Sequence, residues 1–250
     1  MIVNTMNNEV KMKRNKYIEN PYVHRLYDNK KEVYDYRLFI NDFNSIGHEI
    51  DEIYNKLQSS TKDDLLELQI SSFGGYFNDY MRLCNLCKEH FYNRVTSKTH
   101  YGFSCGAFAA LLGDERIIYQ NSQLMFHNVT SGLVGKMSDI EQQFHFDKKY
   151  YDKFLKSVLS PYFTTTEIES IWNGKDMWLD ALEMCKRKIA TQIFMYGDYW
   201  DADFYVDFMT NRAEHKKLID TMYENLEQFN KADADNIKYE YNKLHRRKSE

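Results

Sequence analysis

The stretch of sequence that decides the fold is residues 102–108, Gly-Phe-Ser-Cys-Gly-Ala-Phe, in which a serine lies between two glycines. Residues 94–100 before it predict a strand and residues 107–112 predict a short helix, so Ser104 falls at a strand-to-helix turn. Seven of the ten glycines lie between positions 74 and 135. Because glycine permits tight turns and close backbone approach, this part of the chain is expected to surround a site.

Outward from this turn, short apolar runs alternate with segments of helical period. The predicted strands cover residues 36–40, 65–70, 94–100, 116–119 and 124–128. The predicted helices cover residues 46–57, 76–91, 107–112, 137–163, 168–172 and 181–193. Strands that alternate with helices indicate βαβ units, so the fold class is α/β with a mainly parallel sheet.

The organisation along the chain is one large domain with two extensions. A length of 250 residues is ample for a single core, and 16% aromatic residues argue against extensive disorder. We expect a polar, extended N-terminal arm over residues 1–35 and the α/β domain over residues 36–194. Residues 195–250, rich in aromatic and charged side chains, predict a helical C-terminal extension.

Composition excludes several function classes. The formal net charge of −4 gives no general affinity for nucleic acid, and no apolar run approaches the length of a membrane helix. The N-terminus lacks the apolar core of a secretory signal, so we expect a cytoplasmic protein. The four cysteines should then be thiols. Cys84 and Cys87 share a C-x-x-C spacing but have no second ligand pair, so we expect no metal site.

Three segments together predict a nucleophilic serine. A serine nucleophile needs an exposed turn, a histidine to take its proton, and backbone N–H groups that stabilise the oxyanion. Ser104 supplies the turn, and His127 lies near the end of a predicted strand. The N–H groups of Cys105 and Gly74 are the expected oxyanion donors, and Gly75 lets substrate approach the backbone.

These segments resemble the proteolytic subunit family of the Clp protease (ClpP). The family carries an N-S-P-G-G-like turn, an A-S-M-G-A-F-like nucleophile segment and a histidine after P-N-S-x-x-M-x. The matching stretches are Ser-Ser-Phe-Gly-Gly (71–75), Phe-Ser-Cys-Gly-Ala-Phe (103–108) and Gln-Asn-Ser-Gln-Leu-Met-Phe-His (120–127). Two further stretches, residues 135–141 and 175–184, resemble the family's handle-helix start and its aspartate segment. The resemblance covers residues 36–194.

The resemblance implies a serine endopeptidase with the triad Ser104, His127 and Asp176. Asp180 and Asp114 remain alternatives for the third member, because many aspartates cap helices. The implied fold is a crotonase-like spiral of βαβ units with a protruding handle helix over residues 136–160. It implies polypeptide substrates, no cofactor, and a homo-oligomer of stacked seven-membered rings, to which an AAA+ unfoldase can bind.

Departures from the family pattern keep alternatives open. Phe73 replaces the proline of the double-glycine turn, where with Gly75 it is expected to bind substrate. Cys105 replaces a methionine, which leaves the backbone donor in place. Lys175 replaces an arginine and lacks its planar fork, which puts ring-to-ring ion pairing in question. The alternatives are a catalytically silent ring subunit that pairs with an active paralogue, a phage protease that processes head or scaffold proteins, and an acyl-CoA enzyme on the same fold.

Overall fold

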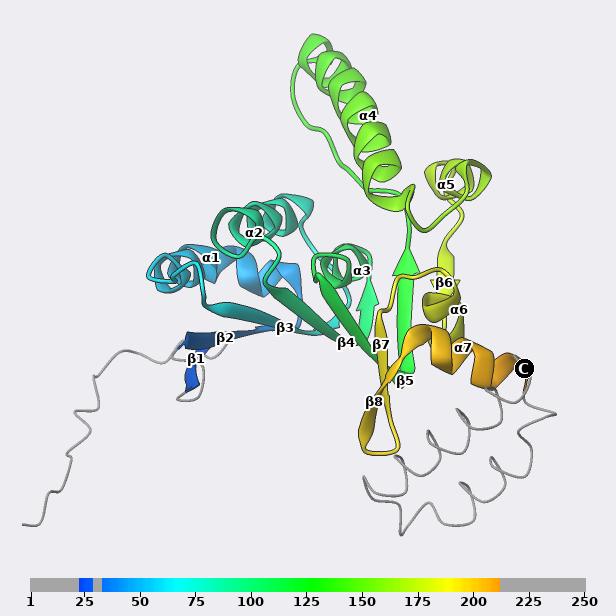
Figure 1. The fold of residues 1–250 in the computed structure, drawn as a ribbon. Coiled ribbons are helices and arrows are strands. Elements are labelled where there is room, and N and C mark those ends of the chain that lie inside the picture. The colour runs from blue at the N-terminus through cyan, green and yellow to red at the C-terminus, as the bar shows by residue number, and fades with distance from the viewer. Residues whose placement is uncertain (1–22, 29–32, 212–250) are drawn as a thin grey trace, which may run out of the picture.

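The computed structural model of the chain describes residues 23–28 and 33–211, which form one twisted sheet with helices beside it (Figure 1). The strands are β1 (Val23–Asp28), β2 (Val33–Ile40), β3 (Leu65–Ser72), β4 (Val95–Phe103), β5 (Glu115–Phe126), β6 (Met177–Leu179), β7 (Gln192–Met195) and β8 (Asp198–Asp201). They lie in the order β1-β2-β3-β4-β5-β7-β8, and β6 pairs with the far end of β5. The strands from β2 to β5 and the pair β5–β7 are parallel, as the alternation of elements predicts.

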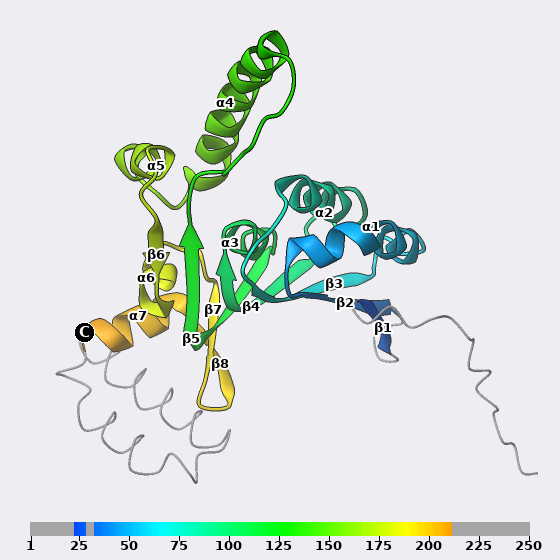
Figure 2. The same cartoon turned by 180° about the vertical axis from the view of Figure 1, so that it is seen from behind.

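The helices are α1 (Phe43–Leu57), α2 (Phe77–His90), α3 (Cys105–Ala110), α4 (Met137–Leu159), α5 (Thr165–Trp172), α6 (Ala181–Lys186) and α7 (Ala202–Thr210). In both views α1, α2 and α3 lie along one face of the sheet, and α4 projects away from it (Figures 1 and 2). The α/β fold with a protruding helix is therefore confirmed. Among the described helices, none combines the length and apolarity that a bilayer crossing requires.

Strand β3 shows how the sequence pattern builds the core. Its residues alternate between half-buried and buried positions along the whole strand. Leu66, Leu68 and Ile70 lie on the buried side, at most 1% exposed. This period of two is what a strand with one face against the helices requires.

The structure joins the two strands predicted at 116–119 and 124–128 into the single strand β5. The polar residues between them favour a turn in the sequence, but the Ser122 side chain is buried and keeps the strand continuous. Its hydroxyl accepts from the Tyr119 N–H at 2.8 Å and donates to the Thr99 carbonyl at 2.5 Å. The side chain thus satisfies backbone groups where the β4–β5 register shifts.

The helix predicted over 181–193 is wrong beyond Lys186. The helix ends in a Schellman motif, in which the Ile189 N–H donates to the Met184 carbonyl at 2.9 Å. Lys188 takes the left-handed position at φ 61°, which glycine usually occupies. Because the sequence has no glycine at this helix end, the apolar residues that follow are predicted to continue the helix. In the structure they lead into strand β7.

Both predicted extensions contain strands that join the sheet. Strand β1 lies in the expected arm and pairs antiparallel with β2. Strand β8 lies in the expected helical extension and pairs antiparallel with β7, before helix α7 begins. Residues 1–22, 29–32 and 212–250 of these two predictions lie outside the described residues.

Candidate active site

Ser104 lies at a strained turn between β4 and α3. Its backbone has φ 56° and ψ −126°, a conformation that non-glycine residues adopt only when the surroundings enforce it. The enforcing contacts come from both sides: the Ser104 N–H donates to the Met125 carbonyl at 2.9 Å, and the Ser104 carbonyl accepts from Ala107 at 3.0 Å. Such a strand-to-helix turn is the arrangement that exposes a nucleophilic hydroxyl.

The double-glycine turn after β3 packs directly on Ser104. A Cβ atom on Gly74 would lie 2.6 Å from the Cβ of Ser104 and 2.8 Å from the Phe103 carbonyl oxygen. Gly74 and Gly75 also have φ values of 104° and 138°, which side chains rarely tolerate. The glycines therefore allow the close backbone approach that the sequence predicts, because a side chain at Gly74 would collide with Ser104.

Glycines also hold α3 close to the sheet. A Cβ atom on Gly106 would lie 2.8 Å from the Ser72 carbonyl oxygen, and one on Gly102 would lie 2.7 Å from the Gly106 carbonyl oxygen. The first turn of α3 thus sits against the ends of β3 and β4, and this close packing fixes the direction in which the Ser104 turn leaves the sheet.

The two expected oxyanion donors differ in their surroundings. Cys105 begins α3, where helix geometry leaves a backbone N–H without an intrahelical acceptor. The Gly74 N–H donates to the Ser72 hydroxyl at 3.1 Å, so this donor is shared with an internal acceptor. The next N–H in the turn belongs to Gly75.

Cys105 itself is no competitor as nucleophile. Burial raises the pKa of its thiol to about 11, against a smaller opposite effect of the Ser104 hydroxyl. The thiol donates to the Gly75 carbonyl at 3.3 Å. At neutral pH this cysteine is protonated, and thiols react as nucleophiles only in the thiolate form.

His127 and Asp176 lie opposite each other just beyond a strand ladder. Strand β6 pairs antiparallel with β5 through Leu124–Leu179, Met125–Trp178 and Phe126–Met177 partners. The next pair in this register is His127 with Asp176, and directly opposed antiparallel residues have Cα atoms about 4.5–5.5 Å apart. Because β5 is also the neighbour of β4, His127 and Ser104 follow the adjacent ends of two parallel strands.

The three residues of the predicted triad differ in exposure. Ser104 and His127 are half-buried and Asp176 is exposed. Within the part of the chain that the structure describes, no hydrogen bond links Ser104 to His127 or His127 to Asp176. The structure therefore places Ser104, His127 and Asp176 at the ends of neighbouring strands, and whether they act as a triad stays a prediction.

The two alternative aspartates have structural roles. The Asp180 carboxylate caps α6 by accepting from the Glu183 N–H at 2.8 Å. The Asp114 carboxylate accepts from the Val95 N–H at 3.0 Å, at the opposite end of β4 from Ser104. Of the three aspartates considered, Asp176 alone stands in register with His127.

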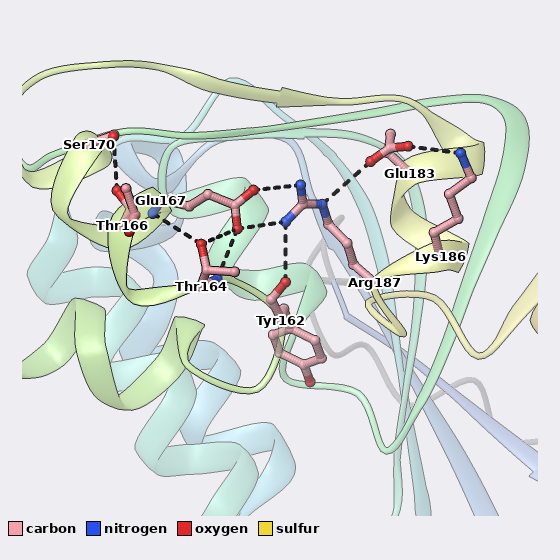
Figure 3. Close-up of polar contacts among 8 residues, drawn as sticks. All are labelled: Tyr162, Thr164, Thr166, Glu167, Ser170, Glu183, Lys186 and Arg187. Carbon is pink, nitrogen blue, oxygen red and sulfur yellow. Dashed lines mark hydrogen bonds and ion pairs between the residues drawn. The ribbon is translucent and has the colours of Figure 1, made fainter.

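An ion pair braces the segment that carries Asp176 (Figure 3). This segment runs from α5 to α6, and the Arg187 guanidinium after α6 donates to Glu167 in α5 at 2.8 and 3.2 Å. Glu167 also completes a capping box with Thr164. These contacts, with the Arg187 guanidinium foremost, lower the pKa of Glu167 to about 2.

This brace should make stability depend on pH. A carboxyl whose pKa is lower in the folded than in the unfolded chain stabilises the fold above its unfolded pKa of about 4.5, and that stabilisation is lost as the pH falls toward 2. We expect Glu167→Gln to lower the free energy of unfolding at pH 7 and to match the wild type near pH 2. Urea titrations at several pH values measure this. Glu115→Gln, at the exposed start of β5, is the control, and equal pH profiles for all three proteins would contradict the prediction.

The sequence alone does not identify two residues whose side chains form hydrogen bonds next to the candidate site. Ser72 accepts from Gly74, and the Asn128 side chain donates to the Trp172 carbonyl at 2.7 Å, which ties the segment after His127 to α5. Ser72 was visible in the double-glycine motif, whereas only the fold brings Asn128 to Trp172.

The cysteines are thiols, as predicted. Cys84, Cys87, Cys105 and Cys185 are all free and buried. Burial raises the pKa of Cys87 far above its usual range and that of Cys185 to about 12. Among the described residues, no cluster of three or more histidine, cysteine or acidic side chains could bind a metal ion.

Comparison with known proteins identifies the family. Residues 37–195, more than half of the chain, match the family model described as Clp protease. A search of the curated proteins found no match. The matched range contains Ser104, His127, Asp176 and the double-glycine turn. The chain therefore belongs to the Clp protease family, a family of peptidases.

Proposed function

We propose that the chain is a serine endopeptidase that cleaves polypeptides through an acyl-enzyme. The observation that carries this proposal is the Ser104 turn, in which a strained serine backbone lies in contact with the backbone of Gly74. A packing role for a serine does not require this strain. Strain of this kind is concentrated at active sites.

In the proposed reaction the Ser104 hydroxyl attacks the carbonyl carbon of the scissile peptide. His127 takes the hydroxyl proton and returns it to the leaving amine, while Asp176 orients the imidazole. The negative oxygen of the tetrahedral intermediate accepts from Cys105 N–H and from the Gly74–Gly75 turn. Water then hydrolyses the ester in the same way, which frees Ser104.

The surroundings of His127 support a polypeptide substrate. Residues 127–134 lie outside helices and strands, so their backbone groups are not committed to the sheet. An open cavity of about 500 Å³ lies between this segment, α4 and Trp172. An extended substrate can pair with such a segment and place a side chain in the cavity.

We further propose that the active form is a ring of identical chains. Met137, Phe144 and Phe146 on the projecting helix α4 are each more than half exposed. Exposed apolar side chains on a protruding helix favour contact with another copy. In this proposal, contacts of this kind would also bring His127 within hydrogen-bond distance of Ser104.

A fluorophosphonate probe tests the proposal, because it reacts with activated serines. We expect the purified full-length chain to be labelled, and peptide mapping to find the label on Ser104. Ser104→Ala should abolish the label, while Ser160→Ala, at the exposed C-terminal end of α4, should keep it. Labelling at another residue, or of neither protein, would contradict the assignment.

A second candidate function is a silent ring subunit that pairs with an active paralogue. The lack of hydrogen bonds among Ser104, His127 and Asp176 in the described structure favours it. Absence of label in a sample that light scattering shows to be a ring would support this candidate over the endopeptidase.

A further inference from the structure

Four aromatic side chains form a continuous cluster at the end of the sheet where Ser104 lies. The Phe73 ring is 5.2 Å from that of Tyr101 and 5.6 Å from that of Phe103, measured between centroids. The Phe103 ring is in turn 5.2 Å from that of Trp178. We call Phe73, Tyr101, Phe103 and Trp178 the aromatic patch.

The patch lies on the face of the sheet opposite α3. Gly102, between two patch residues of β4, faces α3 so closely that a Cβ atom would lie 2.7 Å from the Gly106 carbonyl. Successive residues of a strand point to opposite faces, so Tyr101 and Phe103 point away from the helix. The patch is open to solvent: Phe73 is 72% exposed and Trp178 57%.

The patch is continuous with the candidate active site. Phe73 immediately precedes Gly74, and Phe103 immediately precedes Ser104. Trp178 lies two residues after Asp176, in the strand that brings this aspartate into register with His127. Every element that carries a proposed catalytic group therefore also contributes to, or borders, the patch.

We propose that the aromatic patch binds bulky apolar side chains of the polypeptide substrate, at positions two or three residues from the scissile bond. This inference rests on the proposed endopeptidase function. An extended chain rises about 3.3 Å per residue, so a substrate held at Ser104 reaches the neighbouring rings within that span. The patch presents four aromatic rings, and such rings gain most from apolar or aromatic partners.

A substrate fits this location better than a second copy of the chain. A permanent neighbour over Phe73 and Phe103 would cover the two turns that present Gly74 and Ser104. A substrate occupies the patch only while it occupies the site. Exposed aromatic patches of this kind mark binding surfaces in soluble proteins.

Binding by the full-length Ser104→Ala protein tests the proposal without depending on catalysis. The probes are two fluorescein-labelled decapeptides, identical except that phenylalanines in one are serines in the other. Fluorescence anisotropy should show about tenfold tighter binding of the phenylalanine peptide. Adding Phe73→Ala or Trp178→Ala should remove most of this preference, and Phe73→Tyr, which keeps a ring, should retain it.

Tyr92→Ala is the matched control. Tyr92 is as exposed as Phe73, at 72%, but precedes the opposite end of β4. Its replacement should leave the preference unchanged. The proposal is overturned if the two peptides bind equally, if Tyr92→Ala acts like Phe73→Ala, or if the patch variants change the oligomeric state by light scattering without changing the preference.

The kinetic readout separates this proposal from the proposed function. In the protein with Ser104 intact, patch variants should raise KM for the phenylalanine peptide by about tenfold and lower kcat less. Fluorophosphonate labelling of Ser104 should fall less than peptide cleavage. A wild type that binds the phenylalanine peptide selectively but neither cleaves it nor takes the label would refute the endopeptidase while supporting the patch.

Discussion

Replacing Ser104 by alanine is expected to reduce peptide hydrolysis by at least about 10⁴-fold. The hydroxyl supplies the bond-forming oxygen of the proposed acyl-enzyme, and no neighbouring group can take its place. Cys105 is the nearest alternative, but burial keeps its thiol protonated, with a pKa of about 11. Steady-state cleavage of a fluorogenic peptide, followed to the limit of spontaneous hydrolysis, measures the loss.

His127→Ala separates a triad from a serine that acts alone. Groups that act as one unit are not additive, so Ser104→Ala/His127→Ala should lose no more activity than Ser104→Ala. Light scattering should show the same assembly for all three variants. Cleavage that persists in Ser104→Ala, or losses that multiply in the double variant, would show that Ser104 and His127 do not work together.

The sequence predicts the turn that carries Ser104 because the signals there are local. Small residues and glycines define the turn, and apolar runs of the right length flank it. The same holds for α4, whose period of apolar residues predicts the observed start at Met137 and an end four residues beyond the observed Leu159. Local chemistry of this kind does not depend on what the rest of the chain does.

Other features depend on distant contacts and could not be predicted. The family resemblance names His127 and Asp176, but their opposed positions follow from β6, a strand of three residues that no apolar pattern distinguishes. The continuity of β5 depends on the Ser122 hydroxyl, which finds its acceptor on β4. The end of α6 depends on Lys188 in a conformation that glycine usually provides.

The candidate site shows the same division. The double-glycine motif predicts that another group packs closely against the backbone of the turn. The structure shows that this group is Ser104. The motif does not predict that the Ser72 hydroxyl accepts from Gly74. The sequence does not show whether the Ser72 side chain is buried or exposed. Its burial results from the packing of α3 against the end of β3.

Gly74→Ala is expected to lower the free energy of unfolding by about 2–5 kcal/mol. The same substitution should also abolish fluorophosphonate labelling of Ser104. The new methyl group would lie 2.6 Å from the Ser104 Cβ and 2.8 Å from the Phe103 carbonyl oxygen. Contacts under 3.0 Å force either the Gly74 turn or the Ser104 turn to move. The φ of 104° adds backbone strain. The Gly74 carbonyl also accepts from the Phe43 N–H at 2.7 Å, so a shift of this turn disturbs the start of α1.

Gly132→Ala provides the matched control, since its Cβ atom would meet nothing within 4 Å among the described residues. This variant should change the free energy of unfolding by less than about 0.5 kcal/mol and keep the label. Urea unfolding compares the three proteins. If Gly74→Ala unfolds like Gly132→Ala and is labelled at the wild-type rate, the turn does not press on Ser104. If Gly74→Ala folds stably but loses the label, the close approach of this turn is needed for the reactivity of Ser104 itself, beyond its part in holding β3 and α3 together.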